Sequence, residues 1–375
     1  MQLADLPTPA VLVERARLHD NITRMQTGAA AHDLLLRPHA KTHKSPAIAR
    51  WQLEAGATGI TVAKVGEAEV FADAGVTDIR LAYPVAPSAA PRVIRLMERA
   101  RVSIIVDHPE VAARWSATMI DAGRILDVLV KVDVGFHRCG IDPGATSAVD
   151  FVIGVGALSG LRFRGLLSHA GHSYGAASVD EIESIARDEA ATLSRLADRV
   201  RARGAVVQEI SVGSTPTAHH SLGQLGLTEL RPGNYVFFDL TQVALGAATV
   251  DDCALSVLAT VVSMPSRDRI ILDAGSKTLS SDIARGARAR AGYGGVCLNW
   301  RTPRLSPDLV IERLSEEHAV VLVSRDQPRR LAPGDRVRVI PNHACVVTNL
   351  TDLLRLVDGD DVIENLPVVA RGKNS

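Results

Sequence analysis

The sequence predicts an α/β protein, a (β/α)8 barrel followed by an all-β C-terminal domain. Up to about residue 248, short apolar runs that end at a Gly, a Pro or a charged residue alternate with helical stretches. There are eight such runs, the number that closes a barrel. Most are apolar on both faces, which indicates a parallel sheet covered by helices. After about residue 254 the strand-like runs follow one another directly, separated by turn signals.

The chain begins with a predicted strand, Thr8–Val13, and a helix, Glu14–Met25, with apolar positions at helical spacing. The eight predicted barrel strands are Leu34–Lys41, Gly59–Lys64, Asp78–Pro84, Val102–Asp107, Ile125–Val134, Phe163–His169, Val206–Gly213 and Tyr235–Asp239. The helices between them include Glu67–Ala74, Ala89–Arg101, Pro109–Ala122 and Val179–Arg203. We therefore place the barrel domain at residues 1–248, with about the first 15 residues as candidates to join the second domain.

Residues 249–375 form the predicted strand domain. Its expected strands are Ala254–Met264, Arg269–Asp273, Asp308–Leu314, Ala319–Ser324, Asp335–Pro341, Leu353–Val357 and Val368–Ala370. The Gly-, Arg- and Ala-rich stretch Ser280–Trp300 is expected to be a long loop, and loops of that length in compact domains are usually functional or mobile.

The composition excludes several classes of function. The 375 residues contain 42 Lys plus Arg and 42 Asp plus Glu, so there is no basic field for nucleic acid or a membrane surface. Aromatic residues make up only 3%, which argues against platforms for base stacking. We find no signal peptide and no apolar run of membrane-spanning length, and the four cysteines have no CxxC spacing. We expect a cytoplasmic protein with free thiols.

Titratable residues collect where the first predicted strand ends. Two histidines and two lysines lie within Leu36–Lys44, directly after an apolar run. Strand C-termini form the active face of a (β/α)8 barrel, so Lys41 is placed to present a nucleophilic amine there. The other predicted strand ends on this face are Lys64, Pro84, Asp107, Asp133, His169 and Gly213. The alternative is a solvated basic turn after a strand.

Two small-residue turns could hold an anion. Gly213-Ser214-Thr215-Pro216-Thr217 follows the seventh predicted strand, and Arg231-Pro232-Gly233-Asn234-Tyr235 precedes the eighth. Loops near strands seven and eight hold phosphate in many such barrels. A lysine facing a phosphate site is suited to pyridoxal phosphate, and His169 could stack on its ring or polarise a substituent. A common loop sequence and a structural histidine are the alternatives.

In the strand domain, His343 and Cys345 follow a predicted strand. Because they lie two residues apart on an extended segment, both side chains could reach one metal ion. A thiolate with an imidazole favours zinc, and two protein ligands leave coordination positions open for water or substrate. By spacing alone this signal is weak.

Taken together, these residues resemble the D-threonine aldolase/D-serine dehydratase family of alanine racemase-like (fold-type III) pyridoxal phosphate enzymes. The resemblance covers nearly the whole chain. It rests on Thr8-Pro9-Ala10, Arg37–Lys44, Val65-Gly66-Glu67-Ala68-Glu69, Val132-Asp133-Val134-Gly135, Arg138-Cys139-Gly140, Gly213-Ser214-Thr215-Pro216, Pro232-Gly233-Asn234-Tyr235, Leu272-Asp273-Ala274-Gly275, Pro341–Cys345 and Ala370-Arg371-Gly372.

The resemblance implies a homodimer that acts on small D-amino acids and has Lys41, rather than Lys44, as its Schiff-base lysine. It implies contacts to the cofactor phosphate from Gly213, Ser214, Thr215, Gly233, Asn234 and Tyr235. It also implies His169 and Tyr174 near the cofactor ring, and Arg231 at the pyridine nitrogen. His343 and Cys345 match the family's ligands for a divalent metal, Zn²⁺ or Mn²⁺ with Mg²⁺ as a third candidate.

The family contains two reactions on β-hydroxy-D-amino acids. Our first expectation is D-threonine aldolase-like cleavage to glycine and an aldehyde, because segments such as Gly59-Ile60-Thr61-Val62 and Ala82-Tyr83-Pro84 resemble bacterial aldolases. The alternative is D-serine or D-threo-3-hydroxyaspartate dehydration to a 2-oxo acid and ammonia, favoured by Cys345 at the metal pair. An amino-acid racemase and a non-catalytic pyridoxal phosphate carrier are further alternatives.

Overall fold

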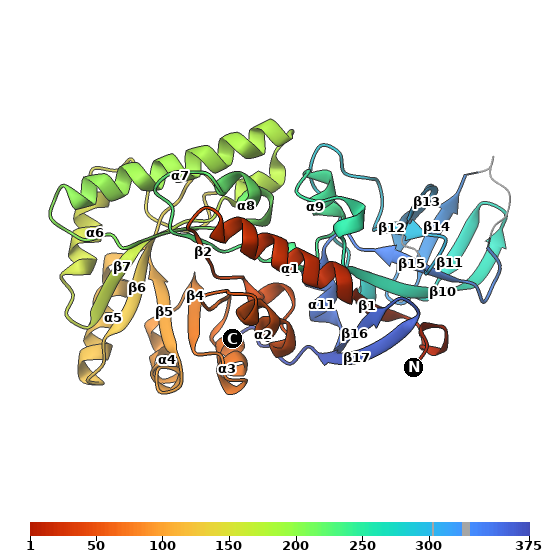
Figure 1. The fold of residues 1–375 in the computed structure, drawn as a ribbon, viewed down its shortest axis with the longest axis horizontal. Helices are drawn as coiled ribbons and strands as arrows, with labels where there is room; N and C mark the ends of the chain where they lie inside the picture. The colour runs from red at the N-terminus through yellow and green to blue at the C-terminus, as the bar shows by residue number, and fades with distance from the viewer. Residues whose placement is uncertain (302–303, 325–330) are drawn as a thin grey trace.

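A computed structural model describes residues 1–301, 304–324 and 331–375 of the chain. The first half forms an eight-stranded parallel sheet in the order β2-β9-β8-β7-β6-β5-β4-β3 (Figure 1). A parallel bridge between His39 and Thr61 joins the two edge strands, so the sheet closes into a barrel. The strands are β2 (Leu35–Leu36), β3 (Ile60–Val62), β4 (Asp78–Pro84), β5 (Arg101–Val106), β6 (Leu126–Lys131), β7 (Leu161–Leu167), β8 (Glu209–Val212) and β9 (Glu229–Leu230).

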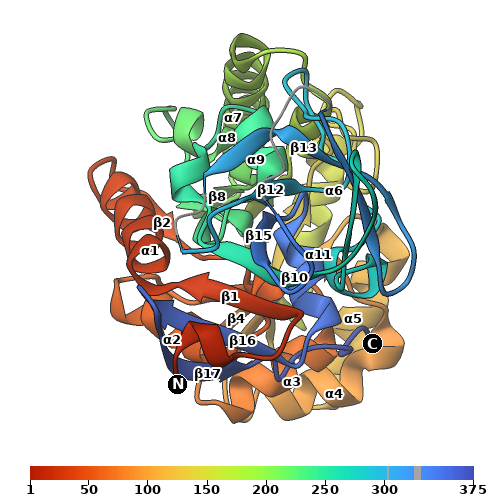
Figure 2. The same cartoon turned by 90° about the vertical axis from the view of Figure 1, so that its right-hand side faces the viewer.

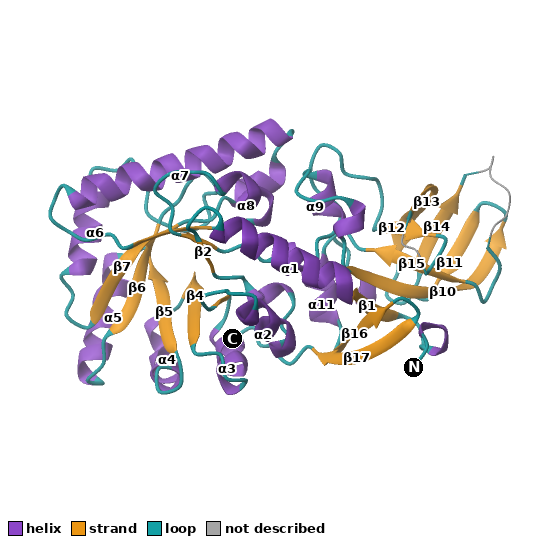
Figure 3. Ribbon diagram, viewed as in Figure 1, coloured by secondary structure: helices purple, strands orange, loops and turns teal. Residues whose placement is uncertain are grey.

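Helices lie on the outside of this barrel (Figure 3). They are α2 (Pro46–Glu54), α3 (Val65–Asp73), α4 (Ala90–Leu96), α5 (Pro109–Asp121), α6 (Ala148–Gly156), α7 (Val179–Arg201) and α8 (Thr215–Ser221). Local sequence sets where several begin: α2 and α5 start at a proline, and the Ser178 hydroxyl accepts a hydrogen bond from the Glu181 amide at the start of α7. No helix of the described residues is long and apolar enough to cross a membrane.

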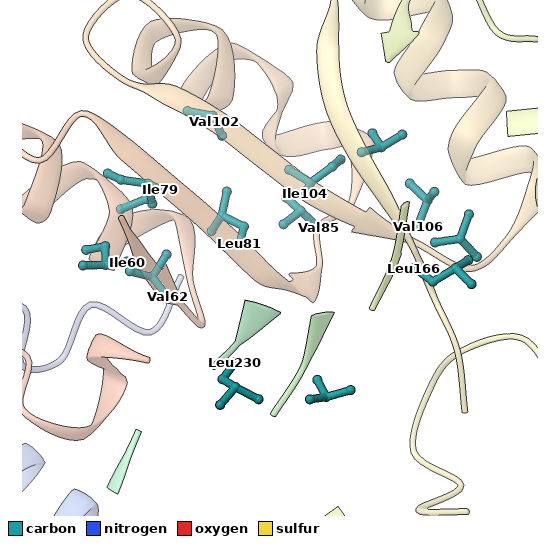
Figure 4. Close-up of a cluster of buried hydrophobic side chains, with 14 of the residues drawn as sticks. Ile60, Val62, Ile79, Leu81, Val85, Val102, Ile104, Val106, Leu166 and Leu230 are labelled. Atoms are coloured by element: carbon teal, nitrogen blue, oxygen red, sulfur yellow. The ribbon is translucent and has the colours of Figure 1, made fainter. Parts of the chain in front are cut away.

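The barrel core consists of the apolar side chains of neighbouring strands and the helices over them. Figure 4 shows part of it, from Ile60 on β3 to Leu230 on β9. The interior of the barrel also contains a cluster of buried charged side chains. There Glu229 pairs with Arg37 at 2.7 Å and with Arg80.

The second sheet has nine strands in the order β11-β14-β13-β12-β15-β10-β1-β16-β17, and Figure 2 labels seven of them, from β13 to β17. Its strands are β1 (Ala10–Glu14), β10 (Leu255–Ser266), β11 (Arg269–Leu272), β12 (Gly295–Cys297), β13 (Leu305–Leu314), β14 (Ala319–Val323), β15 (Arg336–Ile340), β16 (Leu353–Asp358) and β17 (Asp361–Pro367). All but one of the pairings are antiparallel; the exception is β1 with β16. The predicted combination of a barrel and a strand domain is confirmed.

The N-terminal strand β1 pairs with β10 and β16, not with the barrel. Helix α1 (Arg15–Ala30) follows it and extends from the strand domain to the barrel in Figure 1. Val11 and Val13 of β1 share a buried core with Leu255 and Val257 of β10. The division of the chain at residue 248 stays a prediction.

Several predicted elements are wrong in detail. Tyr235–Asp239 is not the eighth barrel strand; it overlaps the 3-10 helix η5 (Asn234–Val236), and the eighth strand is β9. Because β9 has only two residues and its Glu229 points into the charged interior, the strand has no apolar pattern to recognise. The Arg231–Tyr235 turn therefore follows the last barrel strand instead of preceding it.

The strand domain also differs from the prediction. It contains two short helices, α10 (Ser276–Leu279) and α11 (Ala344–Leu350), and Val368–Ala370 is not a strand. Cys345 consequently lies in the first turn of a helix, and only His343, the residue before that helix, has an extended backbone.

Candidate active site

A cavity of about 580 Å³ opens between the strand C-termini and the strand domain. Nearly all predicted site residues line it, from both halves of the chain: Lys41, His169, Tyr174, Gly213, Ser214, Thr215, Arg231, Gly233, Asn234, His343 and Cys345. Tyr235 is the exception among them. Its side chain is fully buried in the barrel core, and its hydroxyl accepts a hydrogen bond from Gln52 at 2.9 Å.

Lys41 lies in the 3-10 helix η2 (Ala40–Thr42), directly after the closing bridge of the barrel. Its backbone amide donates to the His39 imidazole at 3.4 Å. Burial lowers the pKa of Lys41, because the surroundings disfavour its charged form. A lysine with a lowered pKa offers more free amine near neutral pH, which is the nucleophilic form.

Lys44 has a different environment. Its amine is buried, 3.3 Å from Glu67 and donating to Asn349 at 2.8 Å. An amine engaged in a buried ion pair is not available as a nucleophile. The structure thus explains why one of two neighbouring lysines is chemically accessible.

His169 follows β7, and its Nδ1 donates to the Gly213 carbonyl at 2.5 Å. This bond places the proton on Nδ1 and leaves Nε2 as the acceptor. Burial and the nearby Lys41 hold the pKa of His169 well below its ordinary value, so the ring is neutral. Tyr174 lies in the 3-10 helix η4 (Gly171–Gly175), and burial raises the pKa of its hydroxyl.

The loop that follows β8, with Gly213, and the loop that follows β9, with Gly233, lie against neighbouring groups at one side of the cavity. A Cβ atom on Gly213 would lie 3.0 Å from the Arg231 side chain, and one on Gly233 would lie 2.8 Å from the Thr42 hydroxyl. Within the described residues, four backbone N–H groups here donate to no protein group, those of Gly213, Ser214, Thr215 and Gly233. Unpaired amides beside a cavity form a natural anion site.

Arg231 begins the turn after β9. Its guanidinium donates to the Ser211 hydroxyl and the Ser168 carbonyl, which fixes its plane. Burial lowers the pKa of Arg231 to about 10, so the side chain stays charged at neutral pH. The buried Glu229 opposes that decrease.

The predicted metal pair, His343 and Cys345, lines the part of the cavity that the strand domain contributes. His343 precedes α11 and Cys345 is in its first turn, and the Cys345 thiol lies 3.4 Å from the hydroxyl of Thr42, the neighbour of Lys41. The imidazole Nδ1 of His343 donates to the Asp282 carboxylate at 2.5 Å. Burial would lower the pKa of His343, but Cys345, Asp239 and Asp282 raise it to about 10. Cys345, Asp239 and Asp282 thus favour the protonated, positively charged form of the His343 imidazole.

Among the described residues there is no group of three or more His, Cys, Asp or Glu side chains arranged to hold a metal ion. A metal at this position would therefore take two protein ligands and complete its shell with water or substrate. The two-ligand site with open coordination positions, expected from the two-residue spacing, stays a prediction.

Sequence reasoning missed several cavity residues, above all Lys131 and Arg138. Lys131 ends β6, and burial lowers its pKa to about 8. The lysine inside the predicted strand Ile125–Val134 was an available signal, because a charged side chain in a strand buried on both faces needs a polar site such as the cavity. Asp282 and Arg285 belong to the segment that was predicted to be a long functional or mobile loop, of which Gly295–Cys297 instead forms β12.

The chain matches two family models in sequence. The alanine racemase N-terminal domain matches residues 13–241, and the serine dehydratase domain matches residues 254–357. Members of the alanine racemase-like family are pyridoxal phosphate enzymes.

Relatives similar over nearly the full length are named as lyases. D-threo-3-hydroxyaspartate dehydratase of Delftia sp. is 36% identical over 92% of each chain. D-threonine aldolase of Arthrobacter sp. is 34% identical over 99% of this chain and 94% of the relative.

Solved structures of dehydratases and aldolases are also similar to this chain over nearly its full length. The Delftia dehydratase superposes with a TM-score of 0.91 over 98% of both chains, at 34% identity. D-threonine aldolase of Filomicrobium marinum gives 0.89 at 30% identity, over 100% of this chain and 98% of the other. Two further structures of D-threo-3-hydroxyaspartate dehydratase have a cysteine replaced by alanine, in a metal-free form, and a histidine two residues earlier replaced by alanine.

Proposed function

Because the chain belongs to this alanine racemase-like family of D-threonine aldolases and D-serine dehydratases, we propose that it is a pyridoxal phosphate- and divalent metal-dependent lyase. Its substrates are β-hydroxy-D-amino acids. The observation that carries the proposal is that Lys41, from the barrel, and His343 and Cys345, from the strand domain, line one cavity.

The cavity suits the cofactor. Its volume of about 580 Å³ lies within the range of small-molecule sites. The four unpaired amides of the two glycine loops would hold the phosphate, Lys41 would hold the aldehyde carbon, and Arg231 would face the pyridine nitrogen. Bound there, pyridoxal phosphate supplies an electron sink for negative charge at the substrate's Cα.

The protein's own groups divide the proton chemistry between them. Lys41, whose pKa is lowered by burial, is the base that can take a proton from Cα. Neutral His169, with its proton fixed on Nδ1 by the Gly213 carbonyl, can accept a proton at Nε2. These two groups enter the cavity from different strand ends.

His343 and Cys345 would hold the divalent cation, with Zn²⁺ favoured by the thiolate and Mn²⁺ or Mg²⁺ as the other candidates. A cation there polarises the β-hydroxyl oxygen of the substrate. The contact between Cys345 and Thr42 supports this role, because it brings the metal pair next to the segment of Lys41.

Two reactions are open to this arrangement. In the retro-aldol reaction a base takes the β-hydroxyl proton, the Cα–Cβ bond breaks, and glycine and an aldehyde form. In dehydration Lys41 takes the α-proton, the β-hydroxyl leaves with a proton as water, and the enamine product is hydrolysed by water to a 2-oxo acid and ammonia. We keep the retro-aldol reaction as the first candidate. The His-x-Cys pair, at the same spacing as the substituted residues of the dehydratase structures, favours the second.

Product analysis separates the two reactions. We expect the metal-loaded holoenzyme to convert D-threonine to glycine and acetaldehyde if it is an aldolase, and to 2-oxobutanoate and ammonia if it is a dehydratase. A chelator should abolish either activity and a divalent ion should restore it. Racemisation of D-amino acids that survives Cys345→Ala would contradict the lyase proposal, as would the absence of turnover.

Lys41→Ala tests the cofactor assignment. We expect the variant to lose the visible chromophore that borohydride reduces, because the other lysine amine that lines the cavity in the described residues, that of Lys131, is buried and donates to the Val132 carbonyl. Lys277→Ala, a change of an exposed surface lysine, is the control and should keep the chromophore. A borohydride-reducible chromophore in Lys41→Ala would contradict the assignment.

We further infer a homodimer whose partner covers the mouth of the cavity. Three large apolar side chains of its lining are exposed: Tyr83 at 44%, Phe136 at 39% and Ile283 at 64%. Exposed apolar groups gathered at one opening favour an interface. Light scattering after size-exclusion chromatography tests this inference, and a monomer at micromolar concentration would contradict it.

A further inference from the structure

The long segment between α10 and β12 supplies a carboxylate to the wall of the cavity that carries the metal pair. Asp282, early in this segment, accepts a hydrogen bond from Nδ1 of His343 at 2.5 Å. The two residues are 61 positions apart in the chain, and both line the cavity. Their side chains are about equally exposed, 42% and 38%, so the pair lies at the cavity surface and not in the core.

This hydrogen bond determines which nitrogen of His343 is free. A carboxylate can only accept, so Nδ1 keeps its proton and Nε2 is the nitrogen left to bind a cation, which displaces any proton there. The bond also fixes the rotation of the ring about its Cβ–Cγ bond. An imidazole that must bind a cation through Nε2 needs both conditions.

The position of Asp282 is itself fixed by the residue before His343. The buried Asn342 donates from its Nδ2 to the Asp282 carbonyl at 3.0 Å and to the Gly292 carbonyl at 2.9 Å. It thereby holds two points of the loop against the start of α11. Gly292 has a φ of +93°, and a Cβ there would lie 2.4 Å from the Ile311 carbonyl, so this second point of the loop requires glycine.

A second connection fixes the same loop from the barrel side. The Thr241 hydroxyl donates to the Asn342 carbonyl at 2.8 Å and accepts from the Arg285 amide at 3.3 Å. Asp282 is therefore bracketed by backbone contacts on both sides, and its carboxylate is preorganised toward His343 before any cation binds. Such preorganisation is the usual property of groups that support a ligand.

We propose that Asp282 is a positioning residue for the metal pair, holding the His343 imidazole with Nε2 toward the cavity without itself being a ligand. The inference rests on the proposed metal site. Without the carboxylate the His343 ring can rotate. Part of the free energy of cation binding is then spent in orienting the ring. Partners of this kind typically contribute 10- to 100-fold to metal affinity.

The test measures zinc binding directly, by competition with a chromophoric chelator, on holoenzyme that has been stripped of metal. We expect Asp282→Ala to bind Zn²⁺ about 10- to 100-fold more weakly than the unmodified protein. Asp282→Asn should retain most of the affinity, because its amide oxygen accepts the same hydrogen bond. Ser281→Ala, an exposed neighbour on the same loop, is the matched control and should bind as the unmodified protein does.

The outcomes separate this inference from the proposed function. If the unmodified protein binds Zn²⁺ and His343→Ala does not, the proposed metal pair is supported. If Asp282→Ala then binds Zn²⁺ as tightly as the unmodified protein does, only the positioning role of Asp282 is overturned. If Asp282→Asn is as weak as His343→Ala, Asp282 is a ligand, and the inference is also overturned. If the unmodified protein binds no divalent ion, both fail. Unfolding curves of the variants in chelator should coincide, because the role does not concern the fold.

Discussion

At the scale of single residues, Asp239 connects the two walls of the cavity. Its fully buried carboxylate accepts hydrogen bonds from the Asn234 side chain at 2.5 Å, the Gln242 amide at 3.0 Å and the Ala344 amide at 2.9 Å. Asn234 belongs to the proposed phosphate turn, Gln242 lies in the first turn of α9 (Leu240–Ala244), and Ala344 is the first residue of α11. One side chain therefore sets the spacing between the proposed cofactor and metal sites.

Asp239→Ala should consequently reduce stability more than the loss of an ordinary helix cap. We expect the free energy of unfolding to decrease by about 2–4 kcal/mol, because two caps and a buried amide lose their acceptor. Urea unfolding of the cofactor-free protein measures this change.

The matched control is Ser178→Ala, which removes a single cap at the start of α7 at a residue that does not line the cavity. Its expected cost is about 0.5–2 kcal/mol. Equal costs for the two variants would contradict the connecting role of Asp239.

At the scale of elements, the two-residue strand β9 depends on charges inside the barrel. Glu229 accepts from Arg37 on one side and from Arg80 and Ser211 on the other, and these four residues come from different parts of the barrel wall. Burial alone would raise the pKa of Glu229, but Arg80 and Arg37 lower it to about 2. The cluster thus connects this short strand, which pairs with β2 and β8, to further parts of the barrel wall.

The cluster predicts how stability changes in acid. Since the pKa of Glu229 is about 2 in the folded state against an ordinary value of 4.5, its contribution is fully present above pH 4.5. It is lost as the pH falls from 4.5 through 2, and it amounts to on the order of 3 kcal/mol. Unfolding measured by denaturant at several pH values should show this loss.

Glu229→Gln should be less stable at pH 7 and should show a flatter decrease of stability between pH 4.5 and 2. Glu183→Gln, which removes one exposed carboxylate of a helix-surface pair, serves as the control and should keep the slope of the unmodified protein. An unchanged slope in Glu229→Gln would argue that other carboxylates carry the acid response.

At the scale of the whole molecule, the barrel and the strand sheet share elements. The first strand of the chain, β1, lies between β10 and β16, and its side chains complete the core of the strand sheet. In return, Ile340 of β15 and Cys297 of β12 belong to the barrel's core cluster. Each half therefore buries apolar surface contributed by the other.

A fragment of residues 1–248 should not fold as an independent unit. It retains β1 but loses both of its partners, so Val11 and Val13 would be exposed on an unpaired strand. We expect aggregation or a non-cooperative thermal transition by circular dichroism, and recovery of soluble protein when residues 249–375 are co-expressed. A fragment that unfolds cooperatively by itself would contradict the shared core.

The sequence alone determined the fold class and the family, and it predicted which residues stand at the strand ends. Alternating apolar runs and helices encode a barrel locally, and seven of its eight strands could be read from such patterns, as could the small-residue turns around Gly213 and Gly233. Motif similarity then selected Lys41 and joined His343 to Cys345, although the local spacing had indicated an extended segment and not the start of a helix.

Only the tertiary structure decided the remaining points. The contact of Asp282 with His343, the position of β1 in the second sheet and the identity of β9 as the last barrel strand all depend on segments far apart in the chain. Hydrophobic periodicity reports which face of an element is buried, not which distant partner buries it. Contacts such as those of Asp239 and Glu229 arise when packing brings separate segments together, so they leave no pattern in the local sequence.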